Sequence, residues 1–396
     1  MKWIDGGVTA PKGFFSGGIH CGIKQKNPDL AMVVSSSLAT GAACFTKSNM
    51  QAAPVRLCRE YISKTKLFKG IVINSGCANA CTGTQGMDNA RRMSVVAAEL
   101  LGVEPCQMLV CSTGRIGVQL PMDKIEDGIK HLSSSIHERT HIEASRAILT
   151  TDLVPKEAAC EIMFNGTAFT VGAMAKGSGM IAPNMATMLA FLTTDAAVEP
   201  QFLQNVLREA VENTFNRITV DADTSTNDTV IMLANGANGT PPICADSPEA
   251  HLFAQTVLVV CDQLARKIVL DGEGASRLIT VHVGSAQTKD DALRAARTIA
   301  DSLLLKVAFG GNDPNWGRIM AALGRSGVDV DPDKVDIYID NILWIQNGMR
   351  TDVDQDTVKN HWTRDSFTLY VDIHSGDADG SIMTCDITHG YIDINL

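Results

Sequence analysis

The chain has 396 residues, of which 45% are hydrophobic and 20% are charged, and its formal net charge at pH 7 is −10. This length predicts two or three domains with a substantial core. The acidic balance argues against nucleic acid or an anionic membrane as the main partner, because either would require a basic face on the protein. A small anionic substrate is compatible with the acidic net charge, since such a substrate needs only a local basic group.

The first part of the chain alternates short apolar runs with amphipathic segments, which predicts strands that alternate with helices. Strands are expected at 69–76 and 107–114, and both end in a glycine-containing turn. Helices are expected at 87–102, 123–136, 201–215 and 251–272. This pattern predicts an α/β fold built in layers.

The last part of the chain is richer in strands. A strand is expected at 277–284, and the segments 334–344, 366–374 and 381–395 alternate apolar and polar residues, which predicts an antiparallel sheet. We therefore expect a catalytic core that ends at about residue 275, followed by a smaller β-rich α+β region at 276–396.

The sequence gives no sign of export or of a membrane anchor. Its eleven cysteines are irregularly spaced, and the first fourteen residues lack the apolar segment of a signal peptide. The longest uncharged stretch, 177–194, contains Pro183 and Asn184 and would make a poor membrane span. We expect a reduced, cytoplasmic protein.

Two short motifs could suggest nucleotide or phosphate chemistry. The segment "GSGMIA" at 177–182 fits a loose dinucleotide-binding pattern, but Pro183 follows it where a helix should begin. Asp221 and Asp223 follow apolar residues, as in phosphotransferases that use an aspartyl phosphate, and strict magnesium dependence would support that alternative. A polar turn at the end of a strand explains the same two aspartates.

Metal-binding patterns are weak throughout the chain. His137 and His141 are four residues apart on a segment that looks solvated, and Cys77 and Cys81 are too isolated to specify a site. We predict no metal site.

The segment "KGSGMIAPNMATMLAFL", 176–192, joins a glycine-rich loop to an apolar run, and Thr187 stands at the junction. A threonine hydroxyl here can attack the carbonyl carbon of Ala186, which is small, and convert the amide into an ester that water opens. The new α-amine of Thr187 would have a reference pKa near 8, so it could act as a base for its own hydroxyl. By spacing alone, a plain buried strand at 188–192 that carries a threonine is the favoured interpretation.

Longer blocks of sequence change that interpretation. The segment around Thr187 resembles the self-cleavage segment of the ornithine acetyltransferases, also called glutamate N-acetyltransferases, which belong to arginine biosynthesis. The resemblance extends along nearly the whole chain, in the order of that family. It includes "GGVTAPKGF", "NSGCANACTG", "STGRIG", "TTDLVPK", "FNRITVDADTSTNDT", "DGEGA", "FGGNDPNWGRI" and "GYIDIN".

The resemblance implies the processing and the fold. The cut would fall between Ala186 and Thr187, giving an α chain of 1–186 and a β chain of 187–396 that stay together as α2β2. The fold would be a layered α-β-β-α sandwich like that of the self-cleaving aminopeptidases.

The resemblance also assigns roles to individual residues. Thr187 would be the nucleophile, and Thr113 and Gly114 would form the oxyanion hole, where a hydroxyl and a backbone N–H can stabilise charge on a tetrahedral oxygen. Lys176 would pair with a substrate carboxylate and Glu273 with a substrate ammonium. The substrate-binding positions are Thr150, Lys176, Thr187, Glu273 and Asn395.

The implied reaction has two halves. Thr187 takes the acetyl group of N-acetylornithine and releases ornithine, and the amine of glutamate then takes the acetyl group, which predicts ping-pong kinetics. The chemistry requires no cofactor, and acetyl-CoA is left open as a second acetyl donor. A self-processing aminopeptidase or amidohydrolase is the alternative, and it would release its product to water.

This sequence departs from the family at three points. The family usually continues for about five residues beyond the asparagine matched by Asn395, to a final hydroxyl residue, whereas this sequence stops at Leu396. Cys77 and Ala222 replace residues that are often asparagine and glycine. The missing hydroxyl puts in doubt how the substrate site closes, and it makes a non-catalytic homologue conceivable.

Overall fold

The computed structural model describes residues 1–138, 140–164, 166–182 and 188–396. The chain divides into two compact units. The first comprises Met1–Asn216 and Asp223–Ile268, and the second comprises Arg217–Ala222 and Val269–Leu396. The proposed cut between Ala186 and Thr187 lies outside the described residues.

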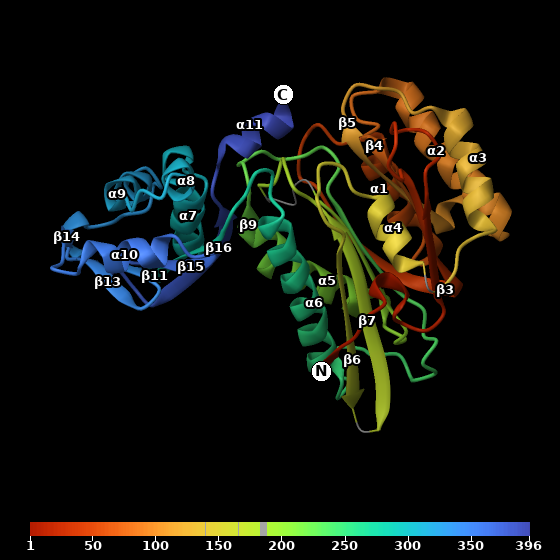
Figure 1. Cartoon of the computed structure of the whole chain (residues 1–396). Coiled ribbons are helices and arrows are strands. Elements are labelled where there is room, and N and C mark those ends of the chain that lie inside the picture. Colours follow the sequence, from red (N-terminus) through yellow and green to blue (C-terminus); the bar gives the residue numbers. More distant parts are fainter. Residues whose placement is uncertain (139, 165, 183–187) are drawn as a thin grey trace. The chain divides into compact units, whose positions relative to one another are not determined.

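The first unit is built on one large sheet (Figure 1). Within the described ranges, this sheet has nine strands in the order β1-β6-β7-β8-β10-β3-β4-β5, and β2 pairs with β3. The strands are β1 (Lys2–Trp3), β2 (Phe14–Ile19), β3 (Leu30–Phe45), β4 (Leu67–Cys77), β5 (Met108–Arg115), β6 (Lys156–Phe164), β7 (Thr167–Lys176), β8 (Leu189–Thr194) and β10 (Thr229–Ala234). The strands predicted at 69–76 and 107–114 are confirmed as parts of β4 and β5.

Strand β8 confirms the buried strand predicted after Thr187. Each of its residues is buried. It pairs antiparallel with β7 on one side and parallel with β10 on the other. A strand that is buried on both faces needs no polar alternation, which explains its continuous apolar sequence.

Helices cover both faces of this sheet at β7. Met174 belongs to the buried cluster to which the helices α1 to α4 contribute. Phe169, five residues earlier and therefore on the opposite face, packs against Phe253 of α6 with ring centroids 5.9 Å apart. The helices are α1 (Ala53–Lys64), α2 (Gly83–Leu101), α3 (Met122–Ser133), α4 (His141–Ala147), α5 (Pro200–Asn213) and α6 (Ala250–Leu270). The predicted mixed α/β class and its layered packing are confirmed.

Local signals set the ends of these helices. Glu199 caps α5, because its carboxylate accepts hydrogen bonds from the backbone N–H groups of Gln201 and Phe202, and Pro200 suits the first helical position. Gly102 ends α2 with φ of 67°, a left-handed conformation that glycine adopts without strain. The predicted helices at 87–102 and 201–215 are confirmed, except that α2 begins earlier, at Gly83, and α5 ends earlier, at Asn213.

The second unit has a smaller sheet with the strand order β14-β13-β12-β15-β11-β16-β9. Its strands are β9 (Ile218–Thr219), β11 (Leu278–Ala286), β12 (Asp336–Ile339), β13 (Ile342–Gln346), β14 (Met349–Arg350), β15 (Ser366–Asp372) and β16 (Ala378–Cys385). Its helices are α7 (Lys289–Ala300), α8 (Leu303–Gly310), α9 (Trp316–Gly324), α10 (Gln355–Trp362) and α11 (His389–Asn395). The β-rich α+β character predicted for this region is confirmed.

Two details of the second unit correct the sequence prediction. The sheet is mixed rather than antiparallel, because β11 pairs with β15 in parallel and β16 pairs with β9 in parallel. The long connection between β11 and β15, which contains several helices, permits parallel pairing. Residues 389–395 form α11 rather than a strand, and the Thr388 side chain caps this helix by accepting a hydrogen bond from the Gly390 N–H.

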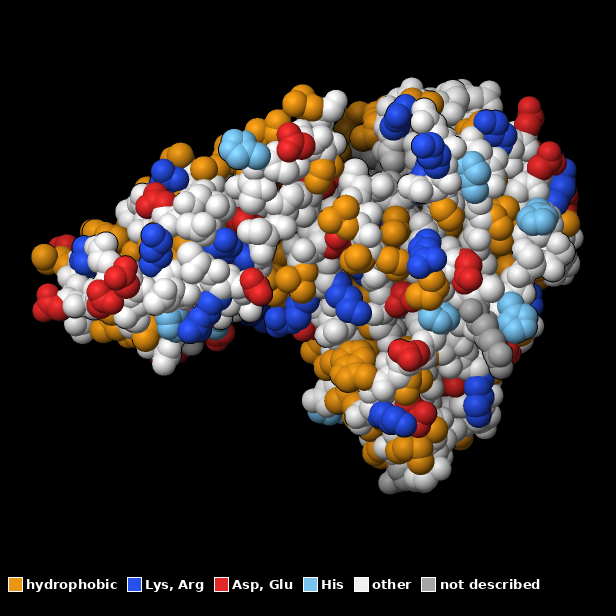
Figure 2. Space-filling model, viewed as in Figure 1, with side chains coloured by type: hydrophobic (Ala, Val, Ile, Leu, Met, Phe, Trp, Pro, Cys, Tyr) orange, Lys and Arg blue, Asp and Glu red, His pale blue; other side chains and the backbone are white. Residues whose placement is uncertain are grey.

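The described part of the chain contains no helix that is both long and apolar enough to cross a membrane. On the face drawn in Figure 2, positive and negative side chains are interspersed. This face therefore offers no continuous basic surface of the kind that nucleic acid requires.

Candidate active site

Met188, which directly follows Thr187, is held by both of its backbone polar groups. Its N–H donates a hydrogen bond to Oδ1 of Asp228 over 2.9 Å. Its C=O accepts one from the N–H of Thr229 over 3.2 Å. Thr187 and Ala186 themselves lie outside the described residues.

Asp228 is a fully buried carboxyl group. Its Oδ2 atom has no hydrogen-bond partner among the residues that the structure describes, which is uncommon for a buried polar atom. Burial raises the pKa of this carboxyl well above its usual range, although the Met188 N–H, the Thr46 hydroxyl and the charge of Lys176 each lower it. The neutral acid is the favoured form, because burial penalises the charged one.

Thr113 and Gly114, the predicted oxyanion hole, lie at the end of β5, where β5 runs parallel to β4. Thr113 is buried, and its hydroxyl makes no hydrogen bond to the residues that the structure describes. The neighbouring Ser112 hydroxyl, in contrast, donates to Oδ1 of Asn74 over 2.6 Å. The Thr113 hydroxyl is therefore available as a donor to a ligand.

Gly114 occupies a position that only glycine fits. Its φ is 122°, and a Cβ atom added to it would lie 2.4 Å from the carbonyl carbon of Gly76. The backbones of β4 and β5 approach each other closely at this pair. Asn227, next to Asp228, donates through Nδ2 to the carbonyl of Ser112 over 2.8 Å. This bond ties the end of β5 to the segment that holds Met188.

Thr150 and Lys176 are brought together by the structure. The ammonium of Lys176 donates to the Thr150 hydroxyl over 2.7 Å. Both contact Asp152, which accepts a bond from the Thr150 N–H over 3.0 Å and lies 3.7 Å from the Lys176 ammonium. The fully buried Lys156 also contacts Asp152, over 2.7 Å.

Asp152 is the charged centre of this group. Burial alone would raise its pKa, but the charges of Lys176 and Lys156 and hydrogen bonds from Lys156 and the Gly177 N–H lower it below its usual range. Asp152 therefore stays ionised and fixes the position of the Lys176 ammonium.

Glu273 and Asn395, the other two predicted substrate-binding residues, lie in the second unit. Nδ2 of Asn395 donates to Oε2 of Glu273 over 2.7 Å and to the carbonyl of Tyr391 over 2.9 Å. Gly274, next to Glu273, has φ of 67° and lies against the backbone of α11. A larger residue would not fit there, because an added Cβ atom would lie 2.3 Å from the nitrogen of Tyr391. Glu273 and Asn395 are therefore hydrogen-bonded to each other, and α11 holds Asn395 in the position that this bond requires.

Comparison with known proteins identifies the family to which the chain belongs. Residues 16–396 match the ArgJ family. A relative from Symbiobacterium thermophilum, the arginine biosynthesis bifunctional protein ArgJ, is 44% identical over 398 residues, which cover 100% of this chain and 99% of the relative. The chain belongs to the ArgJ family.

Other ArgJ proteins show comparable similarity. The arginine biosynthesis bifunctional protein ArgJ of Streptococcus mutans is 42% identical and covers 100% of this chain and 99% of the relative. Among solved structures, the ornithine acetyltransferase of Mycobacterium tuberculosis in complex with ornithine is 36% identical. It covers 46% of this chain and 98% of that one, with a TM-score of 0.43.

Two charged residues of this site were not predicted from the sequence. Asp152 and Asp228 lie within the blocks "TTDLVPK" and "TSTNDT", so the resemblance could have pointed to them, but neither was singled out. Of the weaker candidates, Asp221 belongs to the second unit and Asp223 to the first. The described residues contain no group of three or more potential metal ligands.

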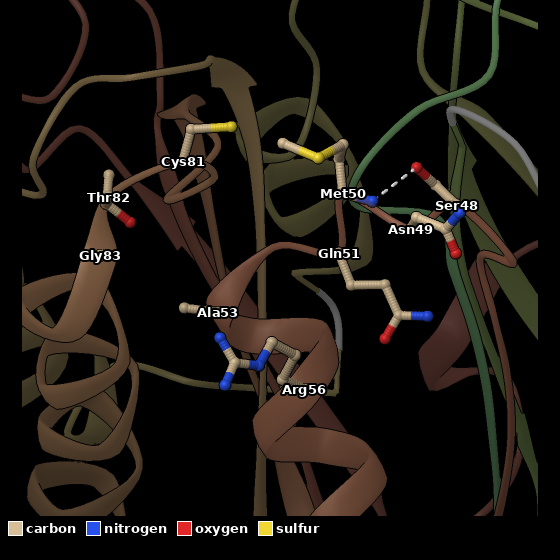
Figure 3. Close-up of a pocket in the computed structure, with 9 residues that line it drawn as sticks. All are labelled: Ser48, Asn49, Met50, Gln51, Ala53, Arg56, Cys81, Thr82 and Gly83. Atoms are coloured by element: carbon tan, nitrogen blue, oxygen red, sulfur yellow. Dashed lines mark hydrogen bonds between the residues drawn. The ribbon is translucent and has the colours of Figure 1, made fainter.

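A surface hollow of about 450 Å³ lies where α1 and α2 begin, and Figure 3 shows its lining. Nine described residues form that lining, among them Ser48, Met50, Arg56 and Cys81, and no predicted site residue is included.

Proposed function

We propose that this chain is an autoprocessed acetyltransferase of arginine biosynthesis that moves the acetyl group of N-acetylornithine to glutamate. The observation that carries the proposal is the 44% identity with a bifunctional ArgJ protein along the full length of both chains. The grouping of Thr150, Lys176 and Asp152 beside one another supports it, because the acetyl donor and acceptor both carry a carboxylate for such a site to bind.

Processing comes first. The Thr187 hydroxyl attacks the carbonyl carbon of Ala186, the amide nitrogen of Thr187 leaves with a proton, and water hydrolyses the resulting ester. The products are the α chain, 1–186, and the β chain, 187–396, whose first residue has a free α-amine. This amine can accept the proton of the Thr187 hydroxyl when that hydroxyl next acts as a nucleophile.

Acetyl transfer then uses the same hydroxyl. It adds to the acetyl carbonyl of N-acetylornithine, and the oxyanion receives hydrogen bonds from the Thr113 hydroxyl and the Gly114 N–H. The tetrahedral intermediate expels the α-amine of ornithine, which takes up a proton, and leaves an acetyl ester on Thr187. The amine of glutamate attacks this ester, loses a proton and departs as N-acetylglutamate.

The remaining groups bind the amino-acid part that both substrates share. Lys176, held by Asp152, pairs with the shared α-carboxylate together with Thr150. Glu273 with Asn395 is suited to the side-chain ammonium of N-acetylornithine, which glutamate lacks. The reaction needs no cofactor, and acetyl-CoA would serve as a second acetyl donor. The α and β chains remain associated as α2β2 in the cytoplasm.

Mass spectrometry of the denatured protein tests the processing step. We expect two fragments that meet between Ala186 and Thr187 in the wild type and one uncut chain in Thr187→Ala. An uncut wild type would contradict autoprocessing.

A transfer assay tests the reaction class. Ornithine release from N-acetylornithine should depend on glutamate and yield N-acetylglutamate. Release of free acetate at the same rate without glutamate would instead identify an amidohydrolase.

A further inference from the structure

The loop before β3 is held in place by a buried carboxylate. Asp29 accepts hydrogen bonds from the backbone N–H of Cys21 over 2.6 Å, of Gly22 over 3.1 Å and of Lys24 over 2.8 Å. Three charge-assisted bonds to one buried side chain fix the course of the backbone. The side chain of Lys24 therefore leaves this loop from a defined position.

Lys24 reaches the residue that precedes Thr150. Its ammonium donates to the carbonyl of Leu149 over 2.6 Å and to the carbonyl of Pro28 over 2.8 Å. An ammonium has three N–H donors. The third has no acceptor among the residues that the structure describes, so it can serve a ligand.

The stem of the same side chain lies beside the predicted oxyanion hole. A Cβ atom added to Gly76 would lie 3.0 Å from Cγ of Lys24, and Gly76 is the strand partner of Gly114. Lys24 thus extends from the Gly76–Gly114 pair to the Leu149–Thr150 segment. It links two groups of site residues that are far apart in the sequence.

The charges around Lys24 do not balance. Asp29, Lys176 and Asp152 all act electrostatically on Lys24, and Lys156 pairs with Asp152. These residues comprise three lysines and two ionised aspartates, which leaves one positive charge. A partly buried cluster with an excess cation is suited to an anionic ligand.

We propose that Lys24 is a second cation for the substrate carboxylate, which binds between Lys24 and the Thr150–Lys176 pair. This inference rests on the proposed function and extends it, because it places the shared α-carboxylate of N-acetylornithine and glutamate next to the Gly76–Gly114 backbone. Lys24 would then bind both substrates in the same way, and its loss would affect both halves of the reaction.

The test compares substrates with and without the carboxylate. We would measure kcat/KM of the processed enzyme for N-acetylornithine and for its α-carboxamide, in the wild type and in Lys24→Gln. The glutamine keeps N–H donors for the carbonyl of Leu149 but loses the charge. The preference for the carboxylate is the ratio of kcat/KM for N-acetylornithine to kcat/KM for the carboxamide. We expect this ratio to fall at least about tenfold in Lys24→Gln, since a charge-assisted hydrogen bond is lost.

Two further variants make the test specific. Lys26→Gln removes an exposed lysine of the same loop and should leave the preference unchanged. Lys24→Arg keeps the positive charge and should retain most of the preference. It provides a second test of the role of the charge if Lys24→Gln fails to fold. If Lys24→Gln slowed both substrates equally, Lys24 would be only a structural contact and the inference would be wrong.

Binding measurements separate this inference from the proposed function. Titration calorimetry of the wild type should show tighter binding of N-acetylornithine than of its carboxamide. Equal affinities would overturn the role of Lys24. Tight binding without acetyl transfer would instead contradict the proposed function alone.

Discussion

Oδ1 of Asp228 lies 2.9 Å from the backbone nitrogen of Met188, the residue that follows Thr187. A buried carboxyl group, whose pKa burial raises well above its usual range, holds the chain immediately after the proposed nucleophile. The Thr229 N–H binds the carbonyl of Met188 as well. The position of Met188 is thus fixed by Asp228 and by the first residue of β10, which begins more than forty residues later.

We predict that Asp228→Ala slows processing about 5- to 150-fold, because the Met188 N–H loses its buried acceptor at a cost of about 1–3 kcal/mol. Asp228→Asn should process at nearly the wild-type rate, because an amide oxygen can accept the same bond and the group is neutral. The fraction of cut chain, followed by intact mass from the start of expression, measures the rate. Equal rates in the wild type and Asp228→Ala would contradict the positioning role.

Asp152→Asn should destabilise the first unit. The substitution leaves Lys156 and Lys176 buried beside a neutral group, and breaking a buried ion pair in this way typically costs about 3–5 kcal/mol. Urea denaturation measures the change in the free energy of unfolding. Asp127→Asn is the matched control, because the ion pair of Asp127 with Lys130 is largely exposed, and it should have little effect.

The contribution of Asp152 should also depend on pH. Its pKa is lower in the folded chain than the reference value of about 3.9 for the unfolded chain. The stabilisation is therefore complete above about pH 4 and is lost as the pH falls further. A wild type and an Asp152→Asn variant that lost stability in parallel below this pH would contradict the assignment.

Thr113→Val should reduce kcat about 10²-fold while it changes KM little, because the hydroxyl would act on the oxyanion of the transition state. Thr113→Ser keeps the donor and should retain most of the activity. Steady-state kinetics of ornithine release from N-acetylornithine separates the two parameters. A rise in KM with unchanged kcat would assign Thr113 to ground-state binding instead.

The binding of N-acetylornithine should weaken as the pH rises through about 8. Burial lowers the pKa of Lys24 to about 8, with the charge of Lys176 acting in the same direction and those of Asp29 and Asp152 opposing it. Lys24 is charged below this pH and neutral above it, so KM should rise on the alkaline side. In Lys24→Arg the rise should disappear, because the guanidinium stays charged. The same rise in both proteins would assign it to another group.

Gly274→Ala should displace α11, because the new Cβ atom would lie 2.3 Å from the nitrogen of Tyr391. We expect the Glu273–Asn395 hydrogen bond to be lost, KM to rise and processing to continue normally. Gly324→Ala is the control, since an added Cβ atom there meets nothing within 4 Å. Limited proteolysis of the C-terminal helix measures the displacement of α11, and steady-state kinetics measures KM. A displaced helix with an unchanged KM would contradict the role of the Glu273–Asn395 pair in substrate binding.

The sequence by itself was sufficient for the elements whose signals are local. The glycine after α2 and the apolar run of β8 could be interpreted without knowing their neighbours, because helix ends and buried strands depend on nearby residues. The family blocks likewise pointed to Thr113, Thr150 and Lys176, and the structure places Thr150 and Lys176 2.7 Å apart.

The tertiary structure decided what depends on packing between distant segments. The parallel pairing of β11 with β15 and the helical form of 389–395 could not be inferred from alternation, because period-two patterns specify neither the partner strand nor a cap such as Thr388. Lys24, Asp152 and Asp228 are ordinary charged residues in the sequence. Only folding buries Asp152 beside two lysines and Asp228 without an ion-pair partner among the described residues, and burial together with neighbouring charges determines the pKa of each carboxyl group.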